Sequence, residues 1–105
     1  MLSTPSPLLS IRPATVEDVA LVARLIRELA EYERLADAAV ASEADLREQL
    51  FGERPAAEVL VAEADGEPAG FALFFHNFST FLGKRGLYLE DLFVRPAFRG
   101  LGLGR

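Results

Sequence analysis

An Asp-Gly pair at residues 65–66 constrains the fold of this chain more than any other short feature. It lies between two apolar runs, residues 58–64 and 67–78, which read E-V-L-V-A-E-A and E-P-A-G-F-A-L-F-F-H-N-F. Asp-Gly readily adopts the left-handed backbone angles of a two-residue hairpin turn, so the pair predicts two tightly connected antiparallel strands. After a loop over 79–86, the segment L-Y-L-E-D-L-F-V at 87–94 predicts a third strand. We therefore expect an antiparallel meander in the second half of the chain.

The first half of the chain predicts a short strand followed by two helices. Residues 8–14 alternate in hydrophobicity and predict the strand. A helix begins near Thr15, where an acid three residues later approximates a capping box, and it runs to about Tyr32. The apolar positions of this helix recur with helical spacing at Val19, Val22, Ile26 and Leu29. Ser42 caps a second, shorter helix that ends at Gly52.

The composition is that of one globular domain. The chain has 105 residues, half of them hydrophobic, and 11 Lys and Arg against 16 Asp and Glu give a net charge of −5. Proteins that bind nucleic acid usually carry the opposite sign, so no nucleic-acid partner is expected. Residues 1–7, with two prolines and two serines, predict a disordered tail, and residues 8–105 form the domain. No segment has the length of a membrane span or the pattern of a secretory signal, so we expect a cytoplasmic protein with no membrane partner.

The numbers of cysteine and histidine residues limit which catalytic and metal-binding sites this chain can form. The sequence contains no cysteine, which excludes disulfides, thiol nucleophiles and thiolate zinc sites. Its single histidine, His76, ends an apolar strand, where a lone histidine is more often a packing residue than a base. We therefore predict no metal site and no Ser–His triad.

Two adjacent carboxylates interrupt the apolar strand at 87–94. Strict alternation assigns its residues to two faces, Tyr88, Glu90, Leu92 and Val94 on one and Leu87, Leu89, Asp91 and Phe93 on the other. Glu90 and Asp91 would then point in opposite directions. A carboxylate among apolar residues is costly to desolvate unless it has a partner or a chemical task. The alternative is that one or both lie near the sheet edge in contact with solvent.

A glycine-rich segment follows this strand. Gly100, Gly102 and Gly104 offer backbone N–H groups without a Cβ, and Arg99 and Arg105 flank them. Such a segment can surround a phosphate, especially at the N-terminus of a helix, although it can also be a flexible turn. It matches neither the dinucleotide-binding fingerprint nor the Walker motif, because the spacing is G-x-G-x-G and no Gly-Lys-Ser/Thr is present.

R-G-L-G-L-G at 99–104, preceded by L-F-V-R-P, resembles the acyl-CoA loop of the GNAT N-acetyltransferase superfamily. Further segments match in order along the chain, namely I-R-P-A-T, R-L-I-R-E-L-A-E-Y-E, L-V-A-E, G-F-A-L-F-F, L-G-K and Y-L-E-D-L-F-V. Within the superfamily the sequence is most similar to diamine (spermidine/spermine) acetyltransferases. The resemblance implies an α/β (α+β) fold, with a mixed, mostly antiparallel sheet and two N-terminal helices. It also implies acetyl-CoA as co-substrate.

The resemblance assigns roles to particular residues. Glu90 corresponds to a general base that acts through water on the substrate ammonium and also attracts it. Tyr32 and Glu33 correspond to a pair that contacts the polyamine, although packing and solvent exposure would also explain them. The residues assigned to acetyl-CoA are Leu92, Phe93 and Val94, through their backbone to pantetheine, and Arg99, Gly100, Leu101, Gly102, Leu103, Gly104 and Arg105, around the pyrophosphate. Phe81 replaces a bulky aromatic residue that precedes Leu/Ile-Gly-Lys in diamine enzymes.

The resemblance implies transfer of acetyl from acetyl-CoA to a primary amine of a small polyamine or lysine-like substrate, by direct attack in a ternary complex. Family members continue past the loop with a helix, a strand and a later helix whose tyrosine is the general acid. Residues 8–105 are thus expected to be a partial domain that binds acetyl-CoA weakly or pairs through its open strand edge as a homodimer. The alternatives are a non-catalytic GNAT fragment that dimerises or binds a partner, or an enzyme for a protein N-terminus or an aminoglycoside.

Overall fold

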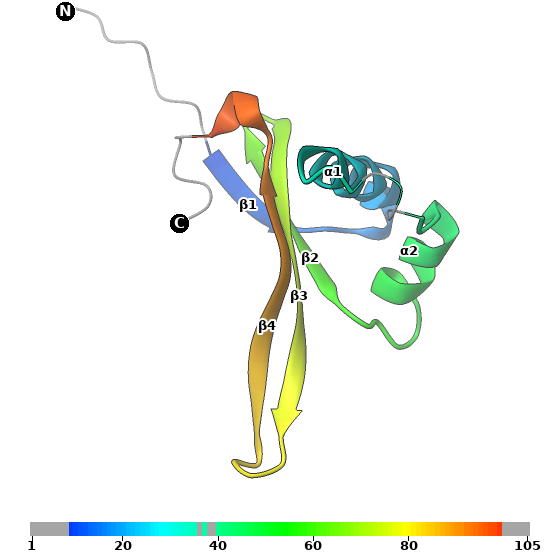
Figure 1. The fold of residues 1–105 in the computed structure, drawn as a ribbon, viewed down its shortest axis with the longest axis vertical. Helices are drawn as coiled ribbons and strands as arrows, with labels where there is room; N and C mark the ends of the chain where they lie inside the picture. The colour runs from blue at the N-terminus through cyan, green and yellow to red at the C-terminus, as the bar shows by residue number, and fades with distance from the viewer. Residues whose placement is uncertain (1–8, 36, 38–39, 100–105) are drawn as a thin grey trace, which may run out of the picture.

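A four-stranded antiparallel sheet with two helices on one face forms this protein (Figure 1). The computed structural model describes residues 9–35, 37 and 40–99. The elements in chain order are β1 (Leu9–Pro13), η1 (Val16–Asp18), α1 (Val19–Tyr32), α2 (Glu43–Phe51), β2 (Glu58–Ala64), β3 (Glu67–Ser79), β4 (Lys84–Val94) and η3 (Pro96–Phe98). The strand order β1-β2-β3-β4 confirms the predicted meander and the α/β fold, and every pairing in the described part is antiparallel. The predicted tail at 1–7 lies outside the described residues.

The Asp-Gly pair forms the predicted hairpin turn. Asp65 and Gly66 have φ angles of 51° and 81°, the left-handed conformation that a two-residue turn of this kind needs at both central positions. The next hairpin is longer than predicted, because β3 continues to Ser79 and β4 already begins at Lys84. The expected loop over 79–86 is therefore wrong in extent, and only residues 80–83 connect the two strands. The first residues of β4 are Lys84, Arg85 and Gly86, and because they are charged or glycine the hydrophobic pattern does not indicate a strand there.

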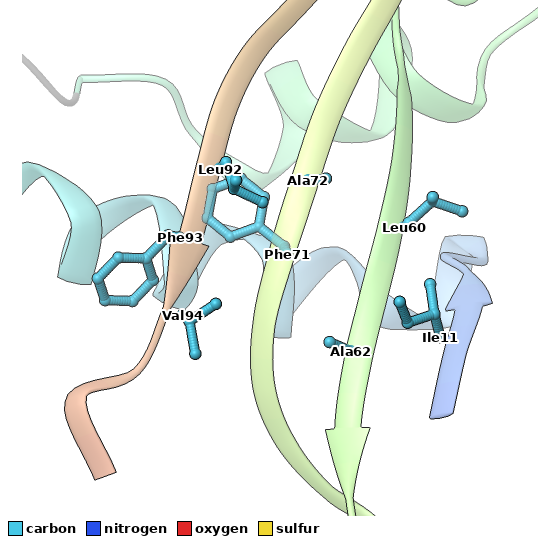
Figure 2. A pocket seen from close by; sticks show the side chains of 8 residues that line it. All are labelled: Ile11, Leu60, Ala62, Phe71, Ala72, Leu92, Phe93 and Val94. Atoms are coloured by element: carbon cyan, nitrogen blue, oxygen red, sulfur yellow. The ribbon is translucent and has the colours of Figure 1, made fainter. Parts of the chain in front are cut away.

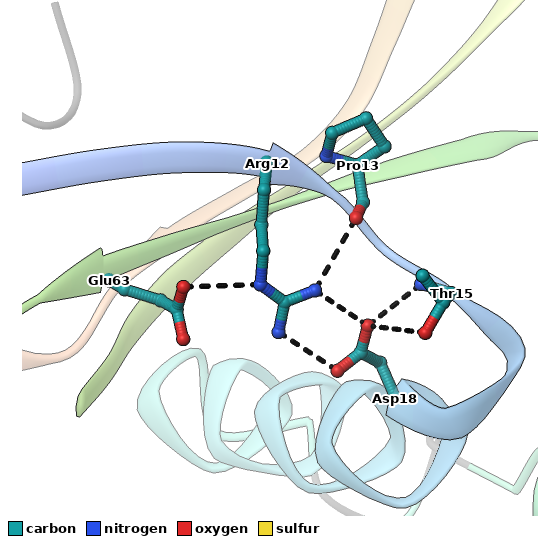
Figure 3. A network of polar contacts seen from close by, with 5 residues as sticks. All are labelled: Arg12, Pro13, Thr15, Asp18 and Glu63. Atoms are coloured by element: carbon teal, nitrogen blue, oxygen red, sulfur yellow. Dashed lines mark hydrogen bonds and ion pairs between the residues drawn. The ribbon is translucent and has the colours of Figure 1, made fainter. Parts of the chain in front are cut away.

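Both predicted helix starts are confirmed, and the first is built into a polar network (Figure 3). The carboxylate of Asp18 accepts a hydrogen bond of 2.7 Å from the backbone N–H of Thr15 and closes the cap. Arg12 on β1 donates to the same carboxylate at 2.8 Å and to Glu63 on β2 at 3.1 Å. The hydrogen bond from Arg12 lowers the pKa of Asp18 from 3.8 to about 2. The network thus joins two strands to the start of α1.

The apolar core lies between α1 and the upper part of the sheet. Of the predicted helical stripe, Val19 and Val22 are buried and Ile26 and Leu29 are half-buried. Val22 and Leu25, the latter not predicted, are inaccessible to solvent. They pack with Val61 on β2, Phe71 on β3 and Phe93 on β4. Together these side chains fix α1 against β2, β3 and β4, which determines how α1 lies relative to β4 in the candidate site.

The remaining surfaces of the sheet are open in the described part of the chain. On the face opposite the helices, a shallow apolar groove of about 60 Å³ runs across all four strands (Figure 2). Its lining residues are Ile11, Leu60, Ala62, Ala72, Leu92 and Val94, together with the core residues Phe71 and Phe93. The lower part of the β3–β4 hairpin extends beyond both helices (Figure 1). Among the described helices, none has both the length and the apolar character needed to span a membrane.

Candidate active site

A β-bulge lies in the middle of the acidic strand segment. In the β3–β4 pairing Leu73 is opposite Asp91, whereas Phe74 is opposite Leu89, so Glu90 is an extra residue on β4. A bulge interrupts the two-residue period of a strand and leaves the extra residue outside the ladder. The alternation predicted for residues 87–94 therefore fails at Glu90.

The bulge corrects the predicted faces of β4. Tyr88 stacks on Phe75 at 4.9 Å, and Phe75 follows Phe71 on the helix-covered face. Tyr88 therefore does not share a face with Leu92 and Val94, which line the groove on the opposite side (Figure 2). Glu90 and Asp91, which were expected to point in opposite directions, both line one hollow.

This hollow lies between the C-terminal end of α1 and β4. It has a volume of about 360 Å³ and is open to solvent. Its lining residues are Ile26, Leu29, Ala30, Glu33, Leu35, Glu90 and Asp91. The side chains thus form an apolar floor with three carboxylates, and we call this feature the acidic hollow. An alkyl chain that ends in an ammonium group matches both parts chemically.

The end of α1 shapes one wall of the acidic hollow. Arg34 has a φ of 60°, and its backbone N–H donates to the carbonyl of Glu31. The N–H of Leu35 donates to the carbonyl of Ala30 at 2.7 Å. These two bonds are the Schellman pattern that ends a helix and reverses the chain. The reversal returns Leu35 to the hollow and leaves Glu33 at its edge.

Asp91 is the residue that the sequence interpretation did not assign to the site. Burial raises the pKa of the Asp91 carboxyl above its usual value, and the nearby charges of Glu90 and Glu33 raise it further. The site is therefore short of positive charge, and a bound cation would relieve the repulsion. In the described residues no three His, Asp or Glu side chains are arranged to hold a metal ion. The Glu-Asp pair was visible in the sequence, but the bulge that turns both side chains to one side was not.

Predicted residues from three separate segments meet where α1 and β4 end. Tyr32, at the end of α1, is 60% exposed, and its ring centroid lies 6.4 Å from that of Phe93. The guanidinium of Arg99 lies over the Tyr32 ring at 4.3 Å and donates to its hydroxyl at 3.0 Å. Arg99 also donates to the backbone carbonyl of Val94 at 2.9 Å. The structure thus brings the expected amine-binding and acetyl-CoA-binding residues into contact.

β4 is the outermost strand of the described sheet. The backbone of Leu92, Phe93 and Val94 is therefore at an edge where an amide-bearing ligand can pair. Gly100, Leu101, Gly102, Leu103, Gly104 and Arg105 lie outside the described residues. Phe81, in the turn at the far end of the hairpin, is fully exposed and does not line the acidic hollow. His76 faces Glu58 at 3.6 Å instead, away from the predicted site.

Comparison with known proteins identifies sequence relatives over most of this chain. The model of the Acetyltransferase (GNAT) family matches residues 21–105. Thialysine N-epsilon-acetyltransferase of Bos taurus is 47% identical over 102 residues, which cover 90% of this chain and 59% of the bovine protein. Spermidine/spermine N(1)-acetyltransferase-like protein 1 of Homo sapiens is 38% identical over 101 residues, 90% of this chain and 14% of the human protein.

Solved structures show the same fold. An aminoglycoside acetyltransferase from an uncultured soil metagenomic sample has a TM-score of 0.75 over 92% of this chain and 64% of its own length. It is 21% identical to this chain, so the likeness concerns the fold alone. The present chain spans about 59% of the length of its bovine relative.

Proposed function

This chain belongs to the GNAT acetyltransferase family, and we propose that its protein transfers acetyl from acetyl-CoA to a primary amine of a small diamine, polyamine or lysine-like substrate. The observation that carries this proposal is the acidic hollow, in which Glu33, Glu90 and Asp91 surround an apolar floor. Relatives named for thialysine, spermidine and ornithine acetylation support a substrate with a charged amine on an aliphatic chain. An uncharged or anionic acceptor would leave the three carboxylates uncompensated.

The acidic hollow binds and orients the amine. The methylene groups of the substrate lie on Ile26 and Leu29, and an ammonium group lies among the carboxylates. Asp91 is half-buried whereas Glu33 and Glu90 are exposed, so Asp91 gains most from a cation beside it. Tyr32 bounds the site next to Glu33 and limits the positions that the substrate chain can take.

Glu90 accepts the proton that the ammonium must lose. A protonated amine has no lone pair for attack, and the exposed carboxylate of Glu90 takes the proton directly or through one water. Acetyl-CoA, when bound, supplies the thioester carbonyl that the amine nitrogen attacks. The C–S bond then breaks to release CoA thiolate, and the nitrogen gives up its second proton to that thiolate or to solvent, which leaves a neutral amide. Direct attack requires no covalent enzyme intermediate, which agrees with a chain that lacks cysteine.

The end of β4 and the residues after it fit acetyl-CoA. The open backbone edge of Leu92, Phe93 and Val94 can pair with the amides of pantetheine, as a further strand would. Arg99 and the glycine-rich segment Gly100–Arg105 hold the pyrophosphate, with charge from Arg99 and Arg105 and backbone N–H groups from the glycines. The guanidinium of Arg99 lies at the end of β4, which is where this arrangement requires a cation.

We also propose that the protein is a cytoplasmic homodimer. Large apolar side chains gather on the extended part of the β3–β4 hairpin and are exposed, namely Phe78, Phe81, Leu82 and Leu87. Apolar residues scattered singly on a surface are normal in a monomer, whereas several gathered in one place mark an interaction surface. A non-catalytic fragment that acts only through this surface is the second candidate function. It predicts dimerisation without acetyl transfer, and light scattering together with an activity assay separates the two.

An amine panel tests the proposed reaction. The purified protein is assayed for CoA release with spermidine, 1,3-diaminopropane, ornithine, thialysine, an aminoglycoside and a peptide N-terminus. We expect turnover with the aliphatic diamines and amino acids, and Glu90→Gln should lower kcat about 100-fold at pH 7. Glu53→Gln, at an exposed position outside the hollow, is the matched control and should keep full activity. Equal activity of Glu90→Gln and the control would contradict the assignment of Glu90.

A further inference from the structure

Arg99 connects the two halves of the candidate site through one side chain. Its Nε donates to the carbonyl of Val94 and its Nη1 donates to the hydroxyl of Tyr32. Its guanidinium also lies over the Tyr32 ring at 4.3 Å and 6.0 Å from the ring centroid of Phe93. Arg99 and Tyr32 are 67 residues apart in sequence and are both exposed. An exposed tyrosine at a helix end would otherwise have several rotamers, and this contact favours one of them.

The guanidinium can hold Tyr32 and an anion together. Arginine has five N–H donors in a planar fork, and the bonds to Val94 and Tyr32 use two of them. The remaining donors suit the oxygens of a phosphate, which guanidinium binds in a two-pronged manner. Tyr32 in turn adjoins Glu33, which lines the acidic hollow. Contacts therefore lead from the end of β4 through Arg99 to Tyr32, and Tyr32 is the neighbour in sequence of a residue that lines the hollow.

We propose that Arg99 is a positioning residue that couples the two substrates, so that a CoA phosphate bound to Arg99 fixes the Tyr32 side chain at the edge of the acidic hollow. This inference rests on the proposed function, because it needs CoA at the end of β4 and an amine in the hollow. The coupling is positive: CoA increases the affinity for the amine about five-fold, and the amine increases the affinity for CoA by the same factor. Acetyl-CoA thereby prepares the site for the amine.

Two variants separate the parts of this contact. Tyr32→Phe removes the hydroxyl that accepts from Arg99 but keeps the ring. It should raise the KM of the amine about five-fold, while the Kd of CoA measured without amine stays unchanged. Arg99→Lys keeps a positive charge but replaces the planar fork of five donors by a single ammonium, which cannot bind a phosphate in a two-pronged manner while it holds Tyr32. It should weaken CoA binding about ten-fold and abolish the dependence of amine affinity on CoA.

Fluorine NMR tests the coupling directly. The chain has two tyrosines and no tryptophan, so incorporation of 3-fluorotyrosine gives two resonances, and Tyr88→Phe identifies that of Tyr32. Tyr88 stacks on Phe75 below the bulge and serves as the internal control. On titration with CoA, the Tyr32 resonance should shift with the same Kd that calorimetry gives, and the Tyr88 resonance should not. In Arg99→Lys, CoA should still bind without the Tyr32 shift.

The outcomes distinguish this inference from the proposed function. CoA binding with no shift of Tyr32, or with an equal shift in Arg99→Lys, overturns the coupling and leaves the CoA assignment intact. Absence of any binding heat overturns the CoA assignment and the coupling with it. A shift of Tyr32 together with a lost coupling factor in Tyr32→Phe supports both.

Discussion

The guanidinium of Arg95 binds the carboxylate of Glu28 through two hydrogen bonds of 2.9 Å, which join the end of β4 to α1. Arg95 also donates to the carbonyl of Pro68 at 3.0 Å, so the same side chain holds the start of β3. The acidic hollow has α1 and β4 as its walls, and this ion pair fixes their separation. Its two-pronged geometry makes it stronger than a typical surface pair.

Glu28→Gln should lower the free energy of unfolding by about 1.5 kcal/mol, because one charge of a partly buried, doubly hydrogen-bonded pair is lost. Urea unfolding at pH 7 measures the change. Arg24→Gln, on the exposed side of α1, is the control and should change stability by less than about 0.5 kcal/mol. A Glu28→Gln protein as stable as this control would show that the pair contributes nothing to the fold.

The cap at Asp18 predicts acid sensitivity. The pKa of Asp18 is lowered in the folded protein from 3.8 to about 2, chiefly by its hydrogen bond from Arg12. A lowered carboxyl pKa contributes stability that is complete above the unfolded value and is lost as the pH falls from about 4 toward 2. Because Arg12 is partly exposed, we expect a contribution of about 1 kcal/mol rather than the full linkage value. Asp18→Asn should reduce the difference in urea stability between about pH 7 and pH 2.5 by that amount, whereas Glu53→Gln should leave it unchanged.

Local signals predicted most of the fold correctly. The Asp65-Gly66 turn and the caps at Thr15 and Ser42 depend on residues close in sequence, and each formed as expected. The apolar stripe of α1 is buried at Val19 and Val22 and half-buried at Ile26 and Leu29. Backbone angles and caps are decided within a few residues, so the sequence contains what is needed to infer them.

The candidate site was harder to predict, because the bulge at Glu90 has no local signature. The segment 87–94 alternates as an ordinary strand does, and the extra residue results from the register that β3 and β4 adopt along their whole length. Tyr32 and Glu33 were expected in the site from resemblance alone, and Glu90 from resemblance together with its position as a carboxylate in an apolar strand. Asp91 and the contact of Arg99 with Tyr32 required the tertiary structure.

Gly70 is a further position where β3 and β4 are in close contact. A Cβ at this residue would collide with the carbonyl oxygen of Phe93 and lie 3.0 Å from the Cα of Val94. Since the obstacle is backbone, β4 itself would have to move, and Gly70→Ala should cost about 2–3 kcal/mol. Gly66→Ala provides the comparison, because its Cβ meets no atom within 4 Å and only the left-handed φ of 81° opposes it. That variant should cost about 1 kcal/mol in urea unfolding, and equal losses in the two proteins would contradict a steric role for Gly70.

Asp91 links the electrostatics of the hollow to both stability and binding. Burial, followed by the charges of Glu90 and Glu33, raises its pKa above the ordinary value of 3.8. A raised carboxyl pKa means that the ionised form is less favourable in the folded protein, so the charge destabilises the fold at pH 7, and this penalty disappears as the pH falls below both pKa values. Asp91→Asn, which keeps the shape but removes the charge, should therefore raise the urea midpoint at about pH 7 and have no such effect at about pH 3.

The same substitution should weaken the binding of the amine. A neutral amide in place of the Asp91 carboxylate cannot compensate an ammonium, and we expect the KM for spermidine to increase about ten-fold while the Kd of CoA stays the same. A protein that gains stability and loses amine affinity is the pattern of a charge retained for binding. Loss of stability in Asp91→Asn at pH 7, with unchanged KM, would instead make Asp91 a structural residue and would remove it from the amine site.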